Sequence, residues 1–171
     1  SGVQVSWDVP AYATGYKIYR ATGSSSTWKQ VKHETSGKTA SWVDTKVTNG
    51  IKYRYKVKAL YGGEESPLTP EGHRYRVVRP AKFTAKSTKA RKLTAAWAGN
   101  NRATCYQLCY ATNKSFSNSR TLNISGSSSK SKTITGLSRG KKYYVKVRAC
   151  KKVGKESYFS AWSAVKLIRV K

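Results

Sequence analysis

The side chains best suited to chemistry are few in this sequence and unevenly distributed. Six of the seven carboxylates lie in residues 1–79, and residues 80–171 hold only Glu156. Enzymatic cleavage of a glycosidic bond normally needs two carboxylates that flank it, so the second half cannot supply the pair. The carboxylates of the first half fall mostly in predicted turns and strand ends, where solvation or capping accounts for them: Asp8, Glu34, Asp44, Glu64, Glu65 and Glu71.

Metal, phosphate and nucleophilic chemistry have equally little support. The sequence has two histidines, His33 and His73, and no Cys-x-x-Cys pair, so no zinc site is expected. It contains no phosphate-binding loop of the form Gly-x-x-x-x-Gly-Lys-Ser/Thr. All three cysteines lie in one half and both histidines in the other, which disfavours a Cys–His pair. We therefore expect a protein that is not an enzyme and that needs no metal and no cofactor.

Positive charge dominates the composition, with a formal net charge of +27 at pH 7. Residues 80–171 carry 21 Lys or Arg against one acid, whereas residues 1–79 carry 13 against six. Such a field attracts polyanions. Lys outnumbers Arg by 23 to 11, and this balance favours diffuse attraction over geometry-selective contacts. Two interpretations stay open: the charge keeps an exposed surface soluble, or it binds an anionic polymer.

One block of sequence occurs twice, ninety residues apart. Trp7 recurs as Trp97, and residues 15–22 recur as residues 105–112. Five further positions keep the same offset: Val47, Gly50, Tyr53, Val57 and Ala59 recur as Leu137, Gly140, Tyr143, Val147 and Ala149. This period is too long for a solenoid repeat and suits a small domain with its own core. The sequence therefore predicts two tandem copies of one domain, over residues 1–79 and 80–171.

Apolar and polar residues alternate along most of the chain, which is the pattern of half-buried strands. The clearest run covers residues 53–59, and its twin covers residues 143–149. Turn-forming residues separate the runs, and no helical period persists beyond a turn. The pattern predicts an all-β sandwich. No apolar run approaches the roughly 18 residues of a transmembrane span, so we expect no membrane insertion.

The repeated residues resemble the fibronectin type III domain over nearly the whole chain. In the first copy the resemblance rests on Trp7, Tyr16 and the motif V-x-x-G-x-x-Y-x-Y-x-V-x-A over residues 47–59, with the matching residues in the second copy. It implies two immunoglobulin-like β-sandwiches. The Trp of strand B anchors each core, and a tyrosine of strand F bonds back to backbone at the E–F corner. The Lys-rich Tyr/Val strands are also similar to modules of Gram-positive bacterial surface proteins.

The first copy departs from the family pattern at its start. Only six residues precede Trp7, whereas residues 80–96 precede Trp97, so the first sandwich is expected to lack most of strand A. The sequence also has no Met, which suggests a piece of a larger protein. Neither predicted F–G loop contains Arg-Gly-Asp, so integrin-type recognition has no support.

The chain ends with residues 158–163 (YFSAWS), which resemble the Trp-Ser-x-Trp-Ser motif of cytokine receptors, with Phe159 at the first Trp. That resemblance implies a ladder of cations and aromatic rings against strand F. Trp162 would then stack over Arg148 or Lys146. We expect the ladder to be structural rather than a ligand contact.

The three cysteines are absent from the equivalent sites of the first copy. In this fold strands C and F are antiparallel neighbours, so the start of C lies beside the end of F. Cys105 and Cys150 would then face each other on the outer surface, within reach of a disulfide. A Cys105–Cys150 bridge and three free thiols remain as alternatives, and Cys109 is unpaired in either case.

Alternation along the neighbouring strands C and F also places basic side chains on their outer faces. Like charges that face each other destabilise a sheet, so they either extend into solvent or meet an anion there. Teichoic acid or a sulfated glycan would suit such a face. Nucleic acid is disfavoured because no platform of stacking aromatic residues is evident. The predicted anion-binding residues are Lys17, Arg54, Lys56, Lys58, Lys146, Arg148, Lys151 and Lys152.

We therefore expect a monomeric, non-catalytic spacer or adhesion module of a larger extracellular or cell wall-associated protein. It would present adjoining domains of the parent chain and contact anionic cell-wall or host glycans or surface proteins. The alternative is a dedicated binder of polyanionic glycan or nucleic acid through the basic outer faces of its sheets.

Overall fold

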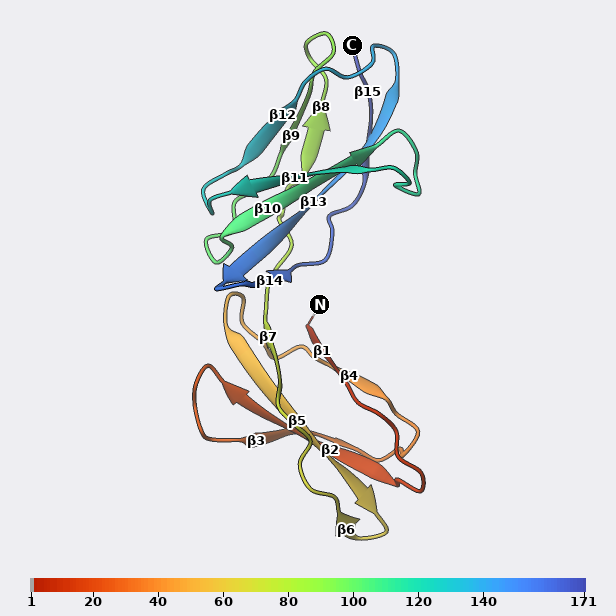
Figure 1. Ribbon diagram of the computed structural model, residues 1–171, viewed down its shortest axis with the longest axis vertical. Helices are drawn as coiled ribbons and strands as arrows, with labels where there is room; N and C mark the ends of the chain where they lie inside the picture. Colours follow the sequence, from red (N-terminus) through yellow and green to blue (C-terminus); the bar gives the residue numbers. More distant parts are fainter. Residues whose placement is uncertain (1) are drawn as a thin grey trace. The chain divides into compact units, whose positions relative to one another are not determined.

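The computed structural model describes residues 2–171, and all regular secondary structure in this part of the chain is β-strand (Figure 1). The chain divides into two compact units, one that ends at Arg76 and one that covers Val77–Lys171. We call them unit 1 and unit 2. The sequence prediction placed the boundary near Arg79-Pro80. Each unit is described below by itself.

Unit 1 consists of two sheets that enclose one core. The smaller sheet pairs β1 with β4, and the larger sheet has the order β3-β2-β5-β6, with β7 also paired to β5. The larger sheet corresponds to the C, C′, F and G strands of the sandwich and the smaller one to B and E. The strands are β1 (Val3–Ser6), β2 (Gly15–Thr22), β3 (Lys29–Glu34), β4 (Ser41–Asp44), β5 (Lys52–Tyr61), β6 (Glu64–Glu65) and β7 (Gly72–Tyr75).

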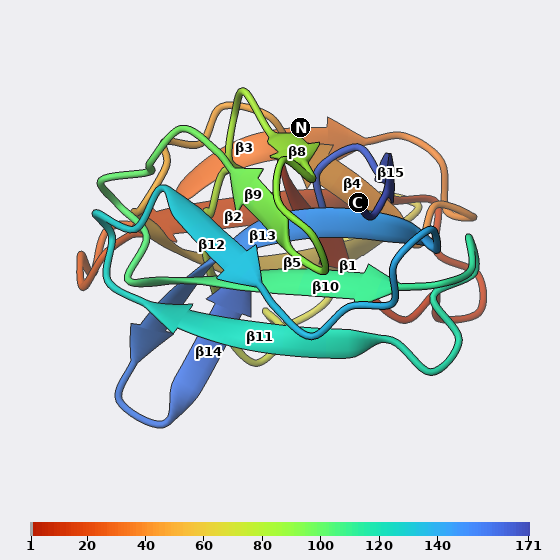
Figure 2. The ribbon, with the colours of Figure 1, turned by 90° about the horizontal axis from the view of Figure 1, so that it is seen from above.

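Unit 2 repeats this arrangement and adds one strand. Its larger sheet has the order β11-β10-β13-β14, with β15 paired to β13, and its smaller sheet has the order β12-β9-β8. Figure 2 shows β8, β9 and β12 side by side. The strands are β8 (Thr84–Lys86), β9 (Leu93–Ala96), β10 (Cys105–Ala111), β11 (Arg120–Ser125), β12 (Ser131–Ile134), β13 (Lys142–Val153), β14 (Glu156–Phe159) and β15 (Lys166–Arg169).

Strict alternation along the two longest strands builds the two cores. On β5 the residues Tyr53, Tyr55, Val57 and Ala59 are buried, while the intervening residues are partly exposed. β13 follows the same pattern from Tyr143. Period-two alternation places one set of side chains on the inner face of a sheet, which is why the sequence predicts both strands correctly.

Each core is centred on a tryptophan and a tyrosine from neighbouring positions in the two sheets. The rings of Trp7 and Tyr16 lie 5.1 Å apart between centroids, and those of Trp97 and Tyr106 lie 5.4 Å apart, both tilted by 50°. Tilted packing at this separation is favourable for aromatic rings. In unit 2 both residues are buried, whereas in unit 1 Tyr16 is buried and Trp7, only partly buried, packs against the core.

The predicted tyrosine corner is present in both units. The hydroxyl of Tyr53 accepts a hydrogen bond from the backbone N–H of Thr48 at 2.9 Å. The hydroxyl of Tyr143 accepts the equivalent bond from Ser138 at 3.2 Å. Each bond ties the corner between the two sheets to the start of the long strand.

The two units differ at strand A. In unit 2, β8 pairs antiparallel with β9. In the part of unit 1 that the structure describes, β1 pairs only with β4, so its other edge has no strand beside it. The prediction that the first sandwich lacks most of strand A is confirmed.

Candidate functional site

The first predicted group of cations lies on the outer face of unit 1, and the protein supplies its own anion there. Lys17 on β2 stands directly opposite Lys58 on β5. The carboxylate of Glu65, on the short strand β6, pairs with Lys17 and also with Lys58, whose Nζ lies 3.0 Å away. The hydrogen bonds from Lys17 and Lys58 lower the pKa of Glu65, and the bond to Glu65 raises the pKa of Lys17. An internal carboxylate therefore offsets the repulsion between the two lysines.

The next two predicted cations of unit 1 stack on a tryptophan that the sequence analysis did not identify. The centroid of a Trp28 ring lies 5.2 Å from the Arg54 guanidinium carbon and 4.9 Å from Lys56 Nζ. Arg54 also forms an ion pair with Glu71 at 2.9 Å. Trp28 lies in an irregular loop directly before β3. Strand alternation does not extend to this loop, so the sequence pattern does not predict its contact with side chains of β5.

Unit 2 carries a longer ladder of cations and rings. Lys146 Nζ lies 3.7 Å from the ring centroid of Phe116 and 4.9 Å from that of Trp162. The Arg148 guanidinium carbon lies 4.4 Å from Trp162 and 4.0 Å from Phe159. The predicted stacking of Trp162 is confirmed for both cations. Phe116, which the sequence analysis missed, comes from the loop between β10 and β11 and caps the ladder.

Partial burial under these rings has an electrostatic consequence. Desolvation lowers the pKa of the Arg148 guanidinium, although it stays charged at neutral pH. Arg148 Nε donates a hydrogen bond to Gln107 Oε1 at 2.8 Å, and Gln107 stands opposite it on β10. Position 107 is the counterpart of Lys17, so unit 2 has an amide where unit 1 has the second lysine of its like-charged pair.

The segments that follow β6 and β14 are held to the long strands by the same kind of backbone anchor. In unit 2 the hydroxyls of Ser160 and Ser163 each accept a backbone N–H from β13, at 3.0 Å. In unit 1 the hydroxyls of Ser66 and Thr69 do the same for β5, at 2.9 and 3.0 Å. The Ser-x-x-Ser/Thr spacing thus replaces strand pairing along part of β5 and β13. It also aligns Leu68 with Trp162 and Glu65 with Phe159.

The last two predicted cations do not join the ladder. Lys151 and Lys152 lie near the end of β13, opposite Tyr158 and Ser157 of β14. Lys151 Nζ lies 3.5 Å from the carbonyl oxygen of Arg102, and Lys152 is exposed. The eight predicted residues thus form four local pairs: one at Glu65 and one at Trp28 in unit 1, one in the ladder of unit 2, and one near the end of β13. Anion binding by any of them stays a prediction.

The predicted cysteine pair is in register. Cys105 lies directly opposite Cys150 at the start of β10 and the end of β13, with their Cα atoms 5.0 Å apart, and their sulfur atoms are bonded. Cys109 is free and buried. Cys109 is on the outer face yet hidden, because a short side chain lies below long neighbours such as Lys146, which stands opposite it.

A buried polar cluster in unit 1 escaped the sequence analysis. Asp44 is 1% exposed and its carboxylate accepts hydrogen bonds from Arg20 Nη1 at 2.7 Å, from the Tyr55 hydroxyl at 3.0 Å and from the N–H of Lys46 at 2.9 Å. Burial, with the bond to Asp44, raises the pKa of Tyr55 above its usual range. In the sequence, Asp44 looks like a solvated or capping carboxylate at a strand end. Nothing in the sequence pattern therefore distinguishes it from a buried partner of Arg20 and Tyr55.

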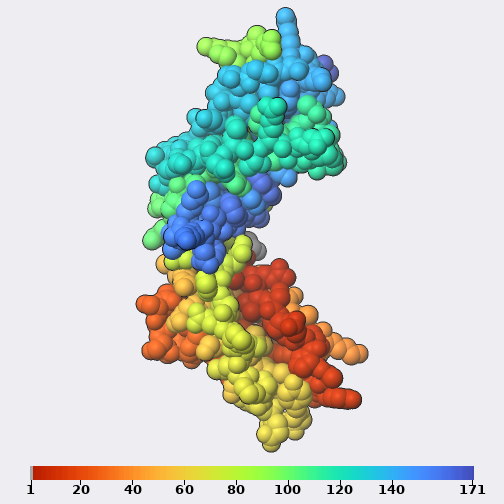
Figure 3. Space-filling model, in the orientation of Figure 1, coloured from red at the N-terminus to blue at the C-terminus, as the bar shows by residue number. Residues whose placement is uncertain are grey.

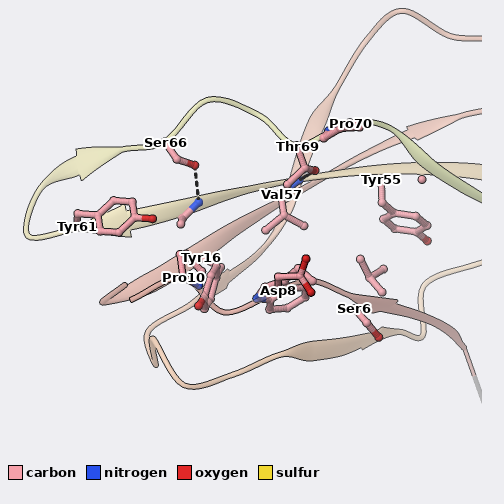
Figure 4. Close-up of a pocket in the computed structure, with 14 residues that line it drawn as sticks. Ser6, Asp8, Pro10, Tyr16, Tyr55, Val57, Tyr61, Ser66, Thr69 and Pro70 are labelled. Atoms are coloured by element: carbon pink, nitrogen blue, oxygen red, sulfur yellow. Dashed lines mark hydrogen bonds between the residues drawn. The ribbon is translucent and has the colours of Figure 1, made fainter. Parts of the chain in front are cut away.

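A cavity of about 400 Å³ opens beside β1 in unit 1 (Figure 4). Trp7 and Asp8 line one side, and Thr69 and Pro70, from the segment between β6 and β7, line the other. Apolar side chains of β5 form its floor, Val57 among them. Figure 3 shows the surface of the first residues beside that of the segment after β5.

Residues 2–171 hold neither a cluster suited to a metal ion nor a helix suited to a membrane. No three His, Cys, Asp or Glu side chains in this range come together to hold a metal ion. No helix in this range is long and apolar enough to cross a membrane.

Comparison with known proteins identifies the family. A family model described as "Fibronectin type III domain" matches residues 78–166, which is more than half of the chain. The chain therefore belongs to the fibronectin type III family, and the fold shows that it consists of two such domains in tandem. A two-domain fibronectin type III segment from chicken tenascin matches 98% of this chain and 91% of its own length, with 16% identity and a TM-score of 0.50.

The sequence relatives are bacterial enzymes of much greater length. The chain is 38% identical over 74 residues to an amylopullulanase of Thermoanaerobacter thermohydrosulfuricus, and 38% identical over 68 residues to an amylopullulanase of Thermoanaerobacterium saccharolyticum. These matches cover 43% and 39% of this chain and 5% of each enzyme. The chain thus spans only a small part of the curated relatives it matches.

Proposed function

We propose that the chain is a non-catalytic module of a larger extracellular protein, in which it spaces and presents neighbouring domains. Domains of the fibronectin type III family are generally non-catalytic. The similarity to short segments of two amylopullulanases supports a place beside a catalytic domain as one setting for the module. Because each unit has its own core, the module can be inserted between other domains as a self-contained element.

One observation favours the spacer over a dedicated binder. The cations first expected to hold a ligand are occupied within the protein: Glu65 pairs with Lys17 and Lys58, and aromatic rings cover Lys146 and Arg148. A polyanion would have to compete with these contacts. A face already satisfied by its own side chains suits a structural element.

Adhesion to anionic polymer is the second candidate, as an added role. The charge of residues 80–171, with 21 basic side chains and one acid, supports it. Lys152, which is exposed near the end of β13, would serve better than the covered cations of the ladder. Such attraction would be diffuse and sensitive to salt.

A salt series separates the two candidates. Dextran sulfate is titrated into the 171-residue chain between about 20 mM and 500 mM NaCl, and binding is followed by calorimetry. A spacer shows no saturable binding near physiological ionic strength. A binder shows saturable binding whose logarithm falls linearly with the logarithm of salt concentration. In the second case Lys151→Gln with Lys152→Gln flattens the slope, whereas Lys146→Gln lowers stability and leaves the slope nearly unchanged.

A further inference from the structure

The small sheet of unit 2, in which β8, β9 and β12 lie side by side (Figure 2), presents a pair of hydroxyl groups on its outer face. Leu93 and Ala95 of β9 are fully buried in the core, so Thr94 between them points outward. Thr94 stands opposite Thr133 on β12, and the two hydroxyls are hydrogen-bonded at 2.9 Å. The pair uses only one of its two hydroxyl protons in this bond, so the other remains available to a ligand.

These two hydroxyls line a hollow of about 310 Å³. Its other lining residues are Thr88, Lys89 and Lys92, which come from the loop between β8 and β9. Each side chain in this lining thus ends in a hydroxyl or an ammonium group. An ammonium group has three donors and no acceptor. The hollow therefore offers hydrogen-bond donors and positive charge to an anion, and no negative charge to a cation.

Hydrogen bonds hold the loop that carries the two cations. The Ser87 hydroxyl donates to the carbonyl oxygen of Lys92 at 2.7 Å and accepts the N–H of Lys171 at 3.0 Å. The N–H of Lys92 donates to the carbonyl oxygen of Lys89 at 3.3 Å, and the N–H of Arg91 donates to that of Lys171 at 2.7 Å. The backbone at both cations is therefore fixed before a ligand arrives, which lowers the entropic cost of binding.

No acidic side chain of unit 2 lies near these cations. Its single acidic residue, Glu156, lies on β14, which pairs with the end of β13. The loop before β9 lies at the other end, because the carbonyl oxygen of Arg91 accepts the N–H of Leu137, shortly before β13 begins. β13 has 12 residues and is therefore roughly 40 Å long, whereas the screening length at physiological ionic strength is about 8 Å. The charge of Lys89 and Lys92 is thus not offset by an acidic side chain of their own unit.

Unit 1 forms the equivalent pair of strands without the hydroxyls. The ninety-residue offset makes Gln4 and Val43 the counterparts of Thr94 and Thr133, and they too stand opposite each other. Val43 is exposed and has no hydrogen-bonding group in its side chain. The pairing of these two strands therefore does not require the hydroxyl pair, which leaves the hydroxyls of unit 2 free for another role.

We propose that this hollow is a binding site for a tetrahedral oxyanion, the sulfate or phosphate group of a small ion or of an anionic polymer. The two ammonium groups offset the charge of the oxyanion, while the Thr88 hydroxyl and the Thr94–Thr133 pair donate to its oxygens. A tetrahedral group presents oxygens in several directions, which suits donors that come from two strands and a loop. The site belongs to unit 2 alone and depends neither on the spacer role nor on adhesion through Lys152.

The first test titrates sodium sulfate into the 171-residue chain at constant ionic strength and follows the backbone amide signals by NMR. We expect saturable shifts at residues 88–94 and at Thr133, with a dissociation constant of roughly 1–10 mM. The amides of Gln4 and Val43 in unit 1 should not move. Shifts that do not saturate, or that are equal in the two units, would overturn the proposal.

Two double variants separate a defined site from the general charge of the protein. Lys89→Gln with Lys92→Gln removes both ammonium groups of the hollow and should weaken sulfate binding about tenfold or more. Lys151→Gln with Lys152→Gln removes the same charge near the end of β13 and should change the affinity by less than about twofold. Equal weakening by the two variants would mean that the field of the whole protein attracts sulfate, and would contradict a site in the hollow.

The hydroxyl pair is tested without any change of charge. Thr94→Val with Thr133→Val removes both hydroxyls and keeps the branched shape that suits a strand. Sulfate binding should weaken about three- to tenfold while thermal unfolding reports an intact unit 2. Unchanged binding by the folded variant would remove the hydroxyls from the site. If that variant fails to fold, Thr88→Ala in the loop provides the same test.

The source of the oxyanion is identified with a short dextran sulfate and the matching uncharged dextran. The sulfated chain should shift the same amides and bind more tightly than free sulfate, because its neighbouring groups rebind, and uncharged dextran should shift none. Sulfate binding without dextran sulfate binding would assign the site to a free ion and exclude adhesion, but not the site. Dextran sulfate binding that survives Lys89→Gln with Lys92→Gln, and is lost in Lys151→Gln with Lys152→Gln, would overturn the site and leave adhesion intact.

Discussion

Units 1 and 2 fill one equivalent core position in opposite ways. In unit 1 the buried carboxylate of Asp44 is bonded to the partly exposed Arg20 and the buried Tyr55. The offset of ninety places Tyr110, Ile134 and Val145 at these positions in unit 2, and all three are buried. One fold thus accepts either a hydrogen-bonded ionic cluster or an apolar cluster at the junction of its two sheets. The ionic cluster requires every partner to be present, because a buried charge without a partner is costly.

The outer faces of β5 and β13 share the same backbone bonds but differ in the side chain that contacts the cation. The hydroxyl anchors are retained in both units. Lys58 meets the carboxylate of Glu65, whereas its counterpart Arg148 meets the ring of Phe159, the counterpart of Glu65. The cation of the long strand is therefore kept and its partner is changed. A lysine suits a single carboxylate, whereas the planar guanidinium of arginine stacks on rings.

The largest expected effect comes from the buried cluster. Asp44→Ala leaves the Tyr55 hydroxyl and the Arg20 guanidinium without their shared acceptor, so unit 1 should lose about 3–4 kcal/mol of its free energy of unfolding. Urea unfolding and calorimetry, with the transition of unit 2 as internal reference, measure this loss. A loss below about 1 kcal/mol would show that water replaces the carboxylate at little cost.

The same cluster can be exchanged for that of unit 2. The triple variant Arg20→Tyr, Asp44→Ile and Tyr55→Val installs the apolar set in unit 1. It should recover more than half of the stability lost in Asp44→Ala, because apolar replacements of buried ionic clusters are often neutral or stabilising. A triple variant less stable than Asp44→Ala would show that the two cores differ in shape as well as polarity.

The next effect concerns the bridge that only unit 2 carries. Reduction of Cys105–Cys150, which closes a loop with a sequence separation of 45, should destabilise unit 2 by about 2–3 kcal/mol and leave unit 1 unchanged. Thiol titration of the unfolded, unreduced chain should detect one thiol, that of Cys109. Detection of three thiols would show that Cys105 and Cys150 are not bonded.

The ladder of unit 2 should contribute somewhat less. Trp162→Ala removes the ring that Lys146 and Arg148 share, and should cost about 2 kcal/mol in unit 2. The matched change in unit 1, Leu68→Ala, should cost well under 1 kcal/mol, because Leu68 is exposed. Thermal unfolding of both variants provides the test. Equal losses would mean that packing alone, and not the cations, stabilises the ladder.

Local sequence patterns predicted the frame of both units because alternation and turn residues act at short range. Alternation predicts the long strands, and the family resemblance implies the Trp–Tyr cores and the tyrosine corners. The Cys105–Cys150 register follows from pairing β10 with β13 in the family arrangement. The count of residues ahead of Trp7 predicted that β1 would have no second partner strand in the described part of unit 1.

The partners of the cations could not be predicted in this way. Trp28 and Phe116 reach the ladders from irregular loops, and β6 has only two residues. A residue's contacts depend there on how a loop folds back across the sheet, and alternation carries no information about that path. The sequence therefore indicated that Lys17 and Lys58 need an anion but not that Glu65 supplies it.

The smallest effect tests that pair directly through pH. The pKa of Glu65 is lowered in the folded protein by Lys17 and Lys58, so its contribution to stability is complete above the usual carboxyl pKa of 4.5 and is lost as the pH falls through the lower folded value. Glu65→Gln should therefore make the unfolding temperature of unit 1 less dependent on pH in this acidic range. It should also make that temperature rise with added salt, which screens the two lysines that then face each other. Glu64→Gln, at the exposed neighbouring position on β6, should reproduce neither change. An identical response of the two variants would mean that net charge, and not the ion pairs of Glu65, sets the acid stability of unit 1.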